Sequence, residues 1–344
     1  MKLNILTIPA LALAATAIVS CENSTNEFPD FDYQTVYFAN QGVGRTLELG
    51  RDLEINTDLD NLHHVNIKAV MGGAYGNSRD RHIGIAVDNG LCDNLFFTED
   101  FGGHKVIPMP DDYYTILADE IVIPSGKLDG GVKIQLTDKF FNDPLALSFN
   151  YVIPVKMTHT NDVDSILEGR PAVENPNRLV PGDWNVLPQD YVLYAMKYVN
   201  PYHAYYLRRG VDRITHGTEQ TTIVRHQKYV ERNEEVHTVT ASLNDCEIDL
   251  STSIDGDHVY KYRLRLAFDD NGACTVSSAD PNMTVTGTGK YVVDGEKKSI
   301  GGKTRDGLYL DYTVNAPAWS VAVKDTLVMR NRGVTAEYPE FVVK

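Results

Sequence analysis

The sequence carries none of the local motifs that mark common catalytic sites. A phosphate-binding loop, a Gly-x-Ser-x-Gly elbow and a His-Glu-x-x-His zinc motif are all absent from its 344 residues. Glycosidases need two carboxylates on either side of a sugar, but 47 acidic residues offer too many pairs for the sequence to identify one. The acidic pairs Asp111-Asp112 and Asp269-Asp270 fall in predicted turns, where we expect solvated side chains. The sequence therefore predicts that the protein is not an enzyme.

Histidine and cysteine follow no spacing that is typical of metal ligands. There is no Cys-x-x-Cys, and the adjacent His63 and His64 cannot readily hold one ion together, so we expect neither a metal nor another cofactor. Cys92, Cys246 and Cys274 are predicted to be buried thiols. The alternative is a Cys246–Cys274 disulfide, which an exported protein could form.

Composition places the chain among acidic globular proteins. Its formal net charge is −15 at pH 7, and 42% of its residues are hydrophobic, which is ordinary for a protein with a core. We do not expect nucleic acid as a partner, because phosphate binding requires clustered lysine and arginine. Adhesion to anionic lipid surfaces is disfavoured for the same reason. Neutral polymers are compatible with this charge.

Short segments of alternating apolar and polar residues, separated by glycine-rich turns, predict an all-β fold. In the first half the alternation recurs in residues 65–69, 83–87, 132–136 and 151–157. We therefore expect an N-terminal Ig-like β-sandwich at residues 33–160. One exception to the strand pattern is residues 138–141, which are expected to open a short helical turn.

A proline-rich stretch, residues 161–190, is expected to be a linker or irregular loop between two domains. Residues 191–344 then return to strand-like patterns. In residues 260–268 one face is apolar and the other basic, and the Asn271-Gly272 pair that follows is a strong hairpin signal. Successive strands of this kind predict an antiparallel meander that closes into a lipocalin-like barrel, because closure removes exposed strand edges. A second β-sandwich is the alternative.

The N-terminus has the pattern of a bacterial export signal. Lys2 precedes an apolar run that ends at Val19 and is too short to span a bilayer, so residues 1–20 are expected to be a signal peptide. The run leads into Cys21, which resembles the lipidated cysteine of a lipobox; an ordinary secretory signal is the alternative. Residues 21–32 form a polar, acidic tether that resembles the surface-export signal of Bacteroides-like lipoproteins. We expect a lipid anchor in the outer membrane, on the extracellular face, with the periplasmic face as the alternative.

Both halves of the chain resemble two-domain surface lipoproteins from Bacteroides-type polysaccharide-utilisation loci. In the first half the resemblance rests on residues 42–50, 109–114, 121–126 and 151–155. In the second half it rests on residues 192–200, 206–210 and 325–333. The resemblance implies a non-catalytic protein that holds oligo- or polysaccharide beside a SusC/SusD-like import pair. The domains that the two halves resemble are of uncharacterised families, so the resemblance carries over neither a ligand nor binding residues.

A site for a sugar needs an exposed aromatic ring for the apolar C–H face and polar groups for the hydroxyls. Trp184, in the proline-rich stretch, and Trp319, ahead of a strand, are the first candidates. The cluster of Tyr202, His203 and Tyr205 is the second. Core packing is the alternative role for each of these residues.

Two other functions remain open. A structural or adhesive, fimbria-like subunit would need a terminal strand that can be donated to a neighbour, and only a short one is expected at residues 338–344. A glycosidase with an unrecognised site would need a cleft with carboxylates roughly 5 to 9 Å apart.

Overall fold

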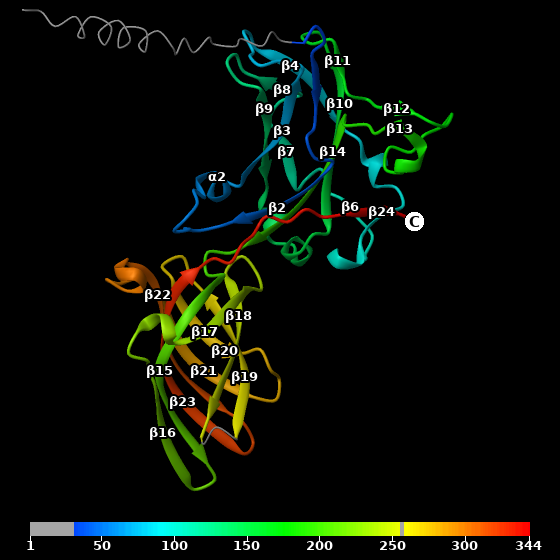
Figure 1. Ribbon diagram of the computed structural model, residues 1–344. Coiled ribbons are helices and arrows are strands. Elements are labelled where there is room, and N and C mark those ends of the chain that lie inside the picture. Colours follow the sequence, from blue (N-terminus) through cyan, green and yellow to red (C-terminus); the bar gives the residue numbers. More distant parts are fainter. Residues whose placement is uncertain (1–30, 255–257) are drawn as a thin grey trace, which may run out of the picture.

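The computed structural model describes residues 31–254 and 258–344, which form two β-rich bodies joined end to end (Figure 1). The expected signal peptide at residues 1–20, Cys21 and the tether up to residue 30 lie outside the described residues. The predicted all-β class is confirmed. The helical turn expected at residues 138–141 is also present, as α3 (Asp138–Phe141). No helix of the described segments has the length and apolar character needed to cross a membrane.

The remaining helical elements are short. They are α2 (Asp58–Asn61) and the 3-10 turns η1 (Asn89–Cys92), η2 (Glu99–Phe101), η3 (Pro144–Leu147), η4 (Pro181–Asp183), η5 (Val230–Arg232) and η6 (Ile300–Gly302).

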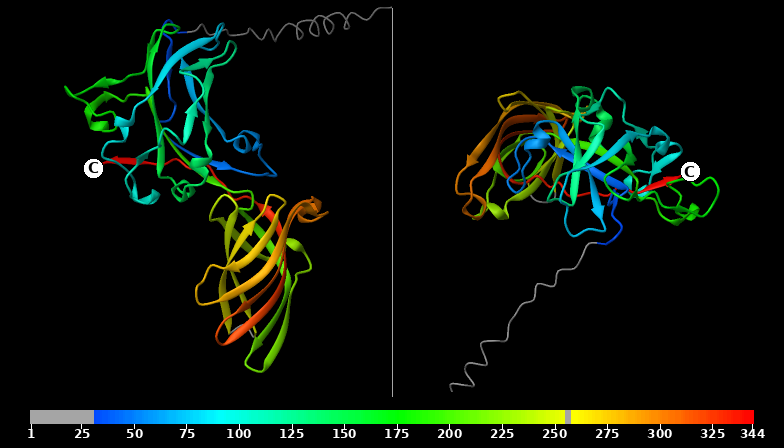
Figure 2. Two further views of the ribbon diagram at one scale, coloured as in Figure 1. Left: turned by 180° about the vertical axis from the view of Figure 1, so that it is seen from behind. Right: turned by 90° about the horizontal axis from the view of Figure 1, so that it is seen from above.

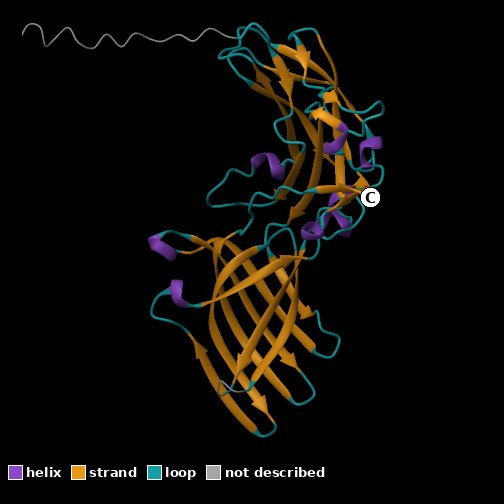
Figure 3. Cartoon of the chain, turned by 45° about the vertical axis from the view of Figure 1, so that its right-hand side comes forward, coloured by secondary structure: helices purple, strands orange, loops and turns teal. Residues whose placement is uncertain are grey.

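The N-terminal body is one curved sheet of 11 strands (Figures 1 and 3). Its strands are β1 (Thr35–Tyr37), β2 (Gly42–Glu48), β3 (His64–Gly72), β4 (Arg81–Val87), β6 (Ile107–Pro108), β7 (Tyr114–Ile116), β8 (Glu120–Ile123), β9 (Asp129–Leu136), β10 (Tyr151–Thr160), β11 (Ser165–Ile166) and β14 (Tyr191–Val199). The order along the sheet is β11-β1-β3-β9-β8-β4-β10-β14-β2, and β6 and β7 pair beside this path. A small separate pair joins β12 (Arg170–Pro171) to β13 (Trp184–Val186).

The alternation in the sequence sets the core of this sheet. Val65 and Ile67 of β3 lie opposite buried residues of β9, and both are themselves buried. The Ig-like sandwich that the sequence predicts would have two facing sheets, whereas these strands are hydrogen-bonded into one. The connection runs through β10, which pairs with β14 and with β4 and is bent by a bulge between Met157 and His159.

The second body is a closed antiparallel barrel of eight strands, which confirms the predicted meander (Figure 3). Its strands are β15 (Ala204–His216), β17 (Glu234–Thr240), β18 (Asp245–Ser253), β19 (Val259–Phe268), β20 (Ala273–Ser278), β21 (Thr284–Glu296), β22 (Arg305–Asn315) and β23 (Trp319–Asn331). Pairing of β15 with β23 along nearly their whole length closes the barrel, and β16 (Glu219–Arg225) pairs with the second half of β15.

Strand β19 shows why the second half folds in this way. Its inward residues, such as Tyr262 and Leu264, are buried, and its outward residues Lys261, Arg263 and Arg265 are exposed, as the period of two predicts. The Asn271-Gly272 pair lies in the turn to β20, where Gly272 adopts a φ of 76°.

The domain boundary differs from the predicted one in two respects. Strand β14, expected to open the second domain, pairs with β10 and in parallel with β2, and so belongs to the first sheet. After the barrel, the chain returns to the N-terminal body, where β24 (Phe341–Val343) pairs with β5 (Leu95–Phe97) (Figure 2). The alternating pattern reveals a strand but not its partner, because backbone hydrogen bonds form in the same way with any neighbouring strand. The barrel is therefore an insertion that two chain segments connect to the first domain.

Candidate ligand-binding cleft

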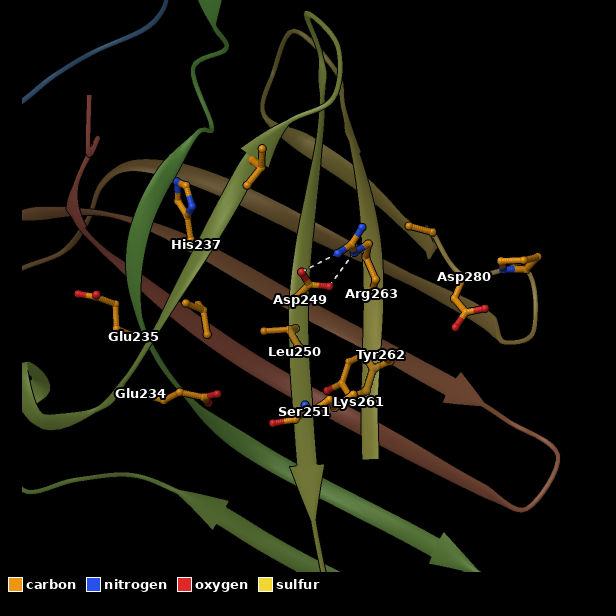
Figure 4. A pocket seen from close by; sticks show the side chains of 14 residues that line it. Glu234, Glu235, His237, Asp249, Leu250, Ser251, Lys261, Tyr262, Arg263 and Asp280 are labelled. Atoms are coloured by element: carbon orange, nitrogen blue, oxygen red, sulfur yellow. Dashed lines mark hydrogen bonds and ion pairs between the residues drawn. The ribbon is translucent and has the colours of Figure 1, made fainter. Parts of the chain in front are cut away.

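A cavity of about 870 Å³ opens in the side of the barrel, where β17 and β18 separate. Within the described chain the two strands pair only over Thr238–Thr240 and Cys246–Ile248. Beyond these residues β17 follows β15 while β18 follows β19, so the strands diverge as a V (Figure 4). We call this V-shaped opening and its rim the side cleft.

The buried side chain of Arg208 contacts three residues that line the side cleft, Glu234, Ser251 and Tyr262. Its Nη1 donates to the carbonyl oxygen of Ser251 (3.1 Å) and to Oε2 of Glu234 (3.3 Å). The carbonyl of Ser251 is available because β18 does not pair with β17 at this residue. Its Nε donates to Oδ2 of Asp325 (2.9 Å) and its Nη2 to the hydroxyl of Tyr262 (3.2 Å). With these partners the guanidinium charge is satisfied inside the barrel. A polar network that is buried in the barrel thus supports residues that line the side cleft.

The rim presents donors and acceptors next to each other. Arg263 of β19 donates from Nε and Nη2 to both carboxylate oxygens of Asp249 of β18 (2.6 and 2.8 Å). These hydrogen bonds lower the pKa of Asp249 and hold it as a carboxylate. Glu235 and Lys261 lie on the remaining rim, and Val239, which is 49% exposed, adds apolar surface at the upper end.

A histidine pair borders the upper end of the side cleft. The ring of Tyr205 stacks on His237 with centroids 4.1 Å apart and an interplanar angle of 7°. Nε2 of His237 lies 3.3 Å from Nε2 of His203, whose Nδ1 accepts a hydrogen bond from the backbone N–H of Thr240. Burial lowers the pKa of His203 to about 3 and also lowers the pKa of His237, so both rings are neutral at pH 7. With Nδ1 accepting, His203 carries its proton on Nε2 and donates it to His237.

The structure separates the five aromatic candidates that the sequence singled out. Tyr205 and His203 contact His237, which lines the side cleft, whereas Tyr202 lies in a different pocket at the domain junction. Trp184 is on β13 of the N-terminal domain, where its Nε1 donates to the carbonyl of Asn177 (2.8 Å). Trp319 is the first residue of β23 and packs half-buried against Tyr260 of β19. Neither tryptophan lines the side cleft.

The sequence analysis did not single out the residues that line the side cleft as binding residues, although the charge pattern of two strands pointed to one pair of them. The outward basic face of β19 had been recognised, and the matching acidic face of β18, with Asp245, Glu247 and Asp249, alternates in the same way. Opposite charges across neighbouring strands would have predicted the pairing of Asp249 with Arg263. The separation of β17 from β18 carries no comparable signal. Among the residues with described positions, no group of three histidine, cysteine, aspartate or glutamate side chains converges as metal ligands.

Comparison with known proteins agrees with this division of the chain. A domain of unknown function, DUF5627, matches residues 201–333, and a family of N-terminal domains matches residues 31–164. A crystal structure of a Bacteroides ovatus protein of unknown function covers 91% of this chain and 100% of its own, with 48% identity and a TM-score of 0.86. None of the curated proteins shows significant sequence similarity.

Two further solved structures are more distant. Another Bacteroides ovatus protein of unknown function covers 90% of this chain and 99% of its own, with 16% identity and a TM-score of 0.40. An auxiliary nutrient binding protein from Bacteroides thetaiotaomicron covers 83% and 90%, with 12% identity and a TM-score of 0.36.

The fold defines a two-domain, all-β protein in which a curved sheet carries a closed barrel with an open side cleft. The chain belongs to the same family as the first Bacteroides ovatus protein, and its barrel is the part that matches DUF5627.

Proposed function

We propose that this protein is a non-catalytic lipoprotein of the cell surface that binds an oligo- or polysaccharide in the side cleft. The observation that carries the proposal is the cleft itself, about 870 Å³ of space lined by alternating charged, hydroxyl and apolar groups. This volume lies within the range of roughly 300–1,000 Å³ that is typical of ligand sites.

The chemistry of the rim suits a sugar. Each hydroxyl of a sugar both donates and accepts, so neighbouring hydroxyls are bound well by a carboxylate beside a guanidinium. Asp249 and Arg263 form such a pair, and each retains polar surface because their side chains are 71% and 51% exposed. Val239 and the ring of His237 offer apolar surface to the C–H faces.

The state of Asp249 suits a hydrogen-bond acceptor and not the proton donor of a glycosidase. A glycosidase needs one carboxylic acid whose raised pKa lets it protonate the leaving oxygen. The pKa of Asp249 is lowered by Arg263, so this residue suits the role of a hydrogen-bond acceptor. Likewise, a fimbria-like function would need a free terminal strand, whereas β24 is paired with β5 of its own chain.

The proposed location follows from Cys21, which we take to be lipidated in the outer membrane with the protein on the extracellular face. The described chain begins at the end of the N-terminal domain remote from the barrel (Figure 1). An anchor there would direct the side cleft away from the membrane, toward external glycan and a SusC/SusD-like import pair. Labelling of intact cells with an impermeant reagent tests this location. We expect the protein to be labelled at the cell surface only when Cys21 is present, and a Cys21→Ala variant should lose its membrane anchor.

A glycan array probed with residues 33–344 tests the binding function. We expect at least one oligosaccharide to be retained and recovered unaltered. Release of shorter products would instead indicate a glycosidase. Absence of binding to every glycan of a broad array from plants, fungi and the host would contradict the proposal.

A further inference from the structure

We propose that a second pocket, at the junction of the two domains, binds the ring of a neutral sugar, so that the protein holds glycan at two separate places. This junction pocket, of about 400 Å³, lies between the loop after β2, at Gly50 and Arg51, and the barrel end at Tyr202 and Tyr291. It shares no lining residue with the side cleft. The inference rests on the proposed function, because it takes the ligand to be a carbohydrate.

Tyr202 provides a preorganised platform in the junction pocket. Its ring stacks on Phe268, with centroids 3.6 Å apart and an interplanar angle of 12°, and meets Tyr291 edge-on at 5.2 Å. Phe268 is buried in the barrel core and covers one face of Tyr202, and the half-buried ring lines the pocket with surface that Phe268 leaves uncovered. A ring that is already fixed loses little further entropy when the C–H face of a sugar stacks on it.

Polar groups surround this platform at distances suited to hydroxyls. Lys290 donates from Nζ to the carbonyl oxygen of Asn271 (2.6 Å), and it forms no ion pair with any residue whose position is described. Its other N–H donors are therefore available to a ligand. Asp270 and the side chain of Asn271, in the turn between β19 and β20, supply acceptors and a further donor.

The balance of charge favours a neutral sugar over an acidic one. Arg51 is already paired, since its Nη1 donates to Asp294 (2.9 Å) and lies 3.5 Å from the buried Asp306. The carboxylate of Asp270 offsets the ammonium of Lys290 on the rim. An anionic ring would therefore gain no net attraction here, whereas the hydroxyls of a neutral ring can bond to either charge.

The junction pocket exists only while the two domains are docked. Gly50 has a φ of 88°, and a Cβ at this position would lie 2.6 Å from the side chain of Pro201 on the barrel side. The missing side chain lets the loop after β2 approach the barrel closely enough to close the pocket. A sugar held between Arg51 and Tyr202 would contact both domains.

Amide shifts in an NMR titration distinguish the two sites. The probe is a set of neutral hexasaccharides of glucose, xylose, mannose and galactose, added to the labelled mature chain with Cys21→Ser. We expect the amides of Asn271 and Gly272 to respond in addition to those of Leu250 and Ser251 in the side cleft. Tyr202→Ala should weaken the first response roughly three- to tenfold and leave the second unchanged, because only the stacking face is lost.

Matched variants separate binding from folding. Tyr202→Phe keeps the stacking face and should keep the response of the junction pocket. Lys290→Met should weaken this response, and because Lys290 is exposed the substitution should not disturb the fold. Tyr229→Ala, which removes another half-exposed tyrosine of the barrel, should leave the response unchanged. Shifts confined to Leu250 and Ser251 would overturn the second site and leave the proposed function standing. Shifts confined to the junction pocket would support the second site and refute the side cleft. If no amide responds at either place, both proposals fail.

Discussion

Arg332, one residue beyond β23, donates a hydrogen bond from Nη1 to the carbonyl oxygen of Leu49 in the other domain (3.0 Å). The same guanidinium donates to the carbonyls of Arg51 (3.1 Å), Asn200 (2.7 Å) and His203 (2.7 Å), and the residue is only 1% exposed. One buried side chain therefore satisfies backbone groups of both domains and of the segment that links them. This arrangement fixes how the barrel is placed on the sheet.

Replacement of Arg332 should loosen this junction. In Arg332→Met, four backbone carbonyls at buried or partly buried positions each lose a hydrogen-bond donor, so we expect the free energy of unfolding to fall by about 3 kcal/mol or more. Urea unfolding measures this loss, and small-angle scattering should report a wider distribution of domain distances. Arg330→Met is the matched control, since Arg330 is 53% exposed and pairs with Glu235 at the surface; its cost should stay below about 1 kcal/mol. Equal effects of the two substitutions would show that Arg332 does not hold the domains together.

Stability should decrease with acid through His203. Burial lowers the pKa of this ring to about 3 in the folded protein, against 6.5 for the free side chain, so between these values the unfolded chain binds a proton that the folded chain excludes. Stability is therefore lost as the pH falls through this window, by up to about 1.4 kcal/mol per pH unit.

His203→Asn tests this prediction, because the Asn amide oxygen can still accept from Thr240 N–H but the side chain does not titrate. Unfolding free energies at pH 7.5, 5.5 and 4.5 should decline less steeply in the variant. The same slope in both proteins would exclude His203 as the source; His237, whose pKa is also lowered by burial, would then be the next residue to replace.

The three cysteines of the described chain should be inert thiols in the folded protein. Cys92, Cys246 and Cys274 are buried and unpaired, in agreement with the expected thiols rather than a Cys246–Cys274 disulfide. Burial raises the pKa of each to about 12, which leaves almost no thiolate at pH 8. A thiol reagent should label none of them in buffer and all three in urea. Fast labelling of the native protein would mean that one of these sites opens readily.

The sequence predicted which side of a strand is buried better than it predicted which strands pair. The apolar and basic faces of β19 follow from the alternation around Leu264, and the turn at Gly272 follows from its local chemistry. The membership of Tyr191–Val199 in the first sheet was missed, because both of its partners are distant in sequence. The side cleft was missed for the same reason: it exists where β17 follows β15 while β18 follows β19.

The candidate binding residues show a similar division. The aromatic cluster in the sequence predicts that Tyr202, His203 and Tyr205 lie together, and all three lie at the junction end of the barrel. Their rings nevertheless contact different environments. The ring nitrogen of Trp184 donates to its own loop and Trp184 lies outside the side cleft, so a sugar-binding role for Trp184 or Trp319 stays a prediction. Surface position depends on the fold and cannot be read from residue type.

The affinity of an array-selected oligosaccharide for Asp249→Asn, measured by calorimetry, tests the account most directly. Asp311→Asn is the matched control, because Asp311 is an exposed carboxylate in a similar cross-strand ion pair, with Lys324 on another part of the barrel (2.9 Å). We predict that Asp249→Asn weakens binding about tenfold, since a charged acceptor is lost, and that Asp311→Asn leaves binding unchanged. Equal affinities for the two variants and the unaltered chain would contradict a glycan site in the side cleft.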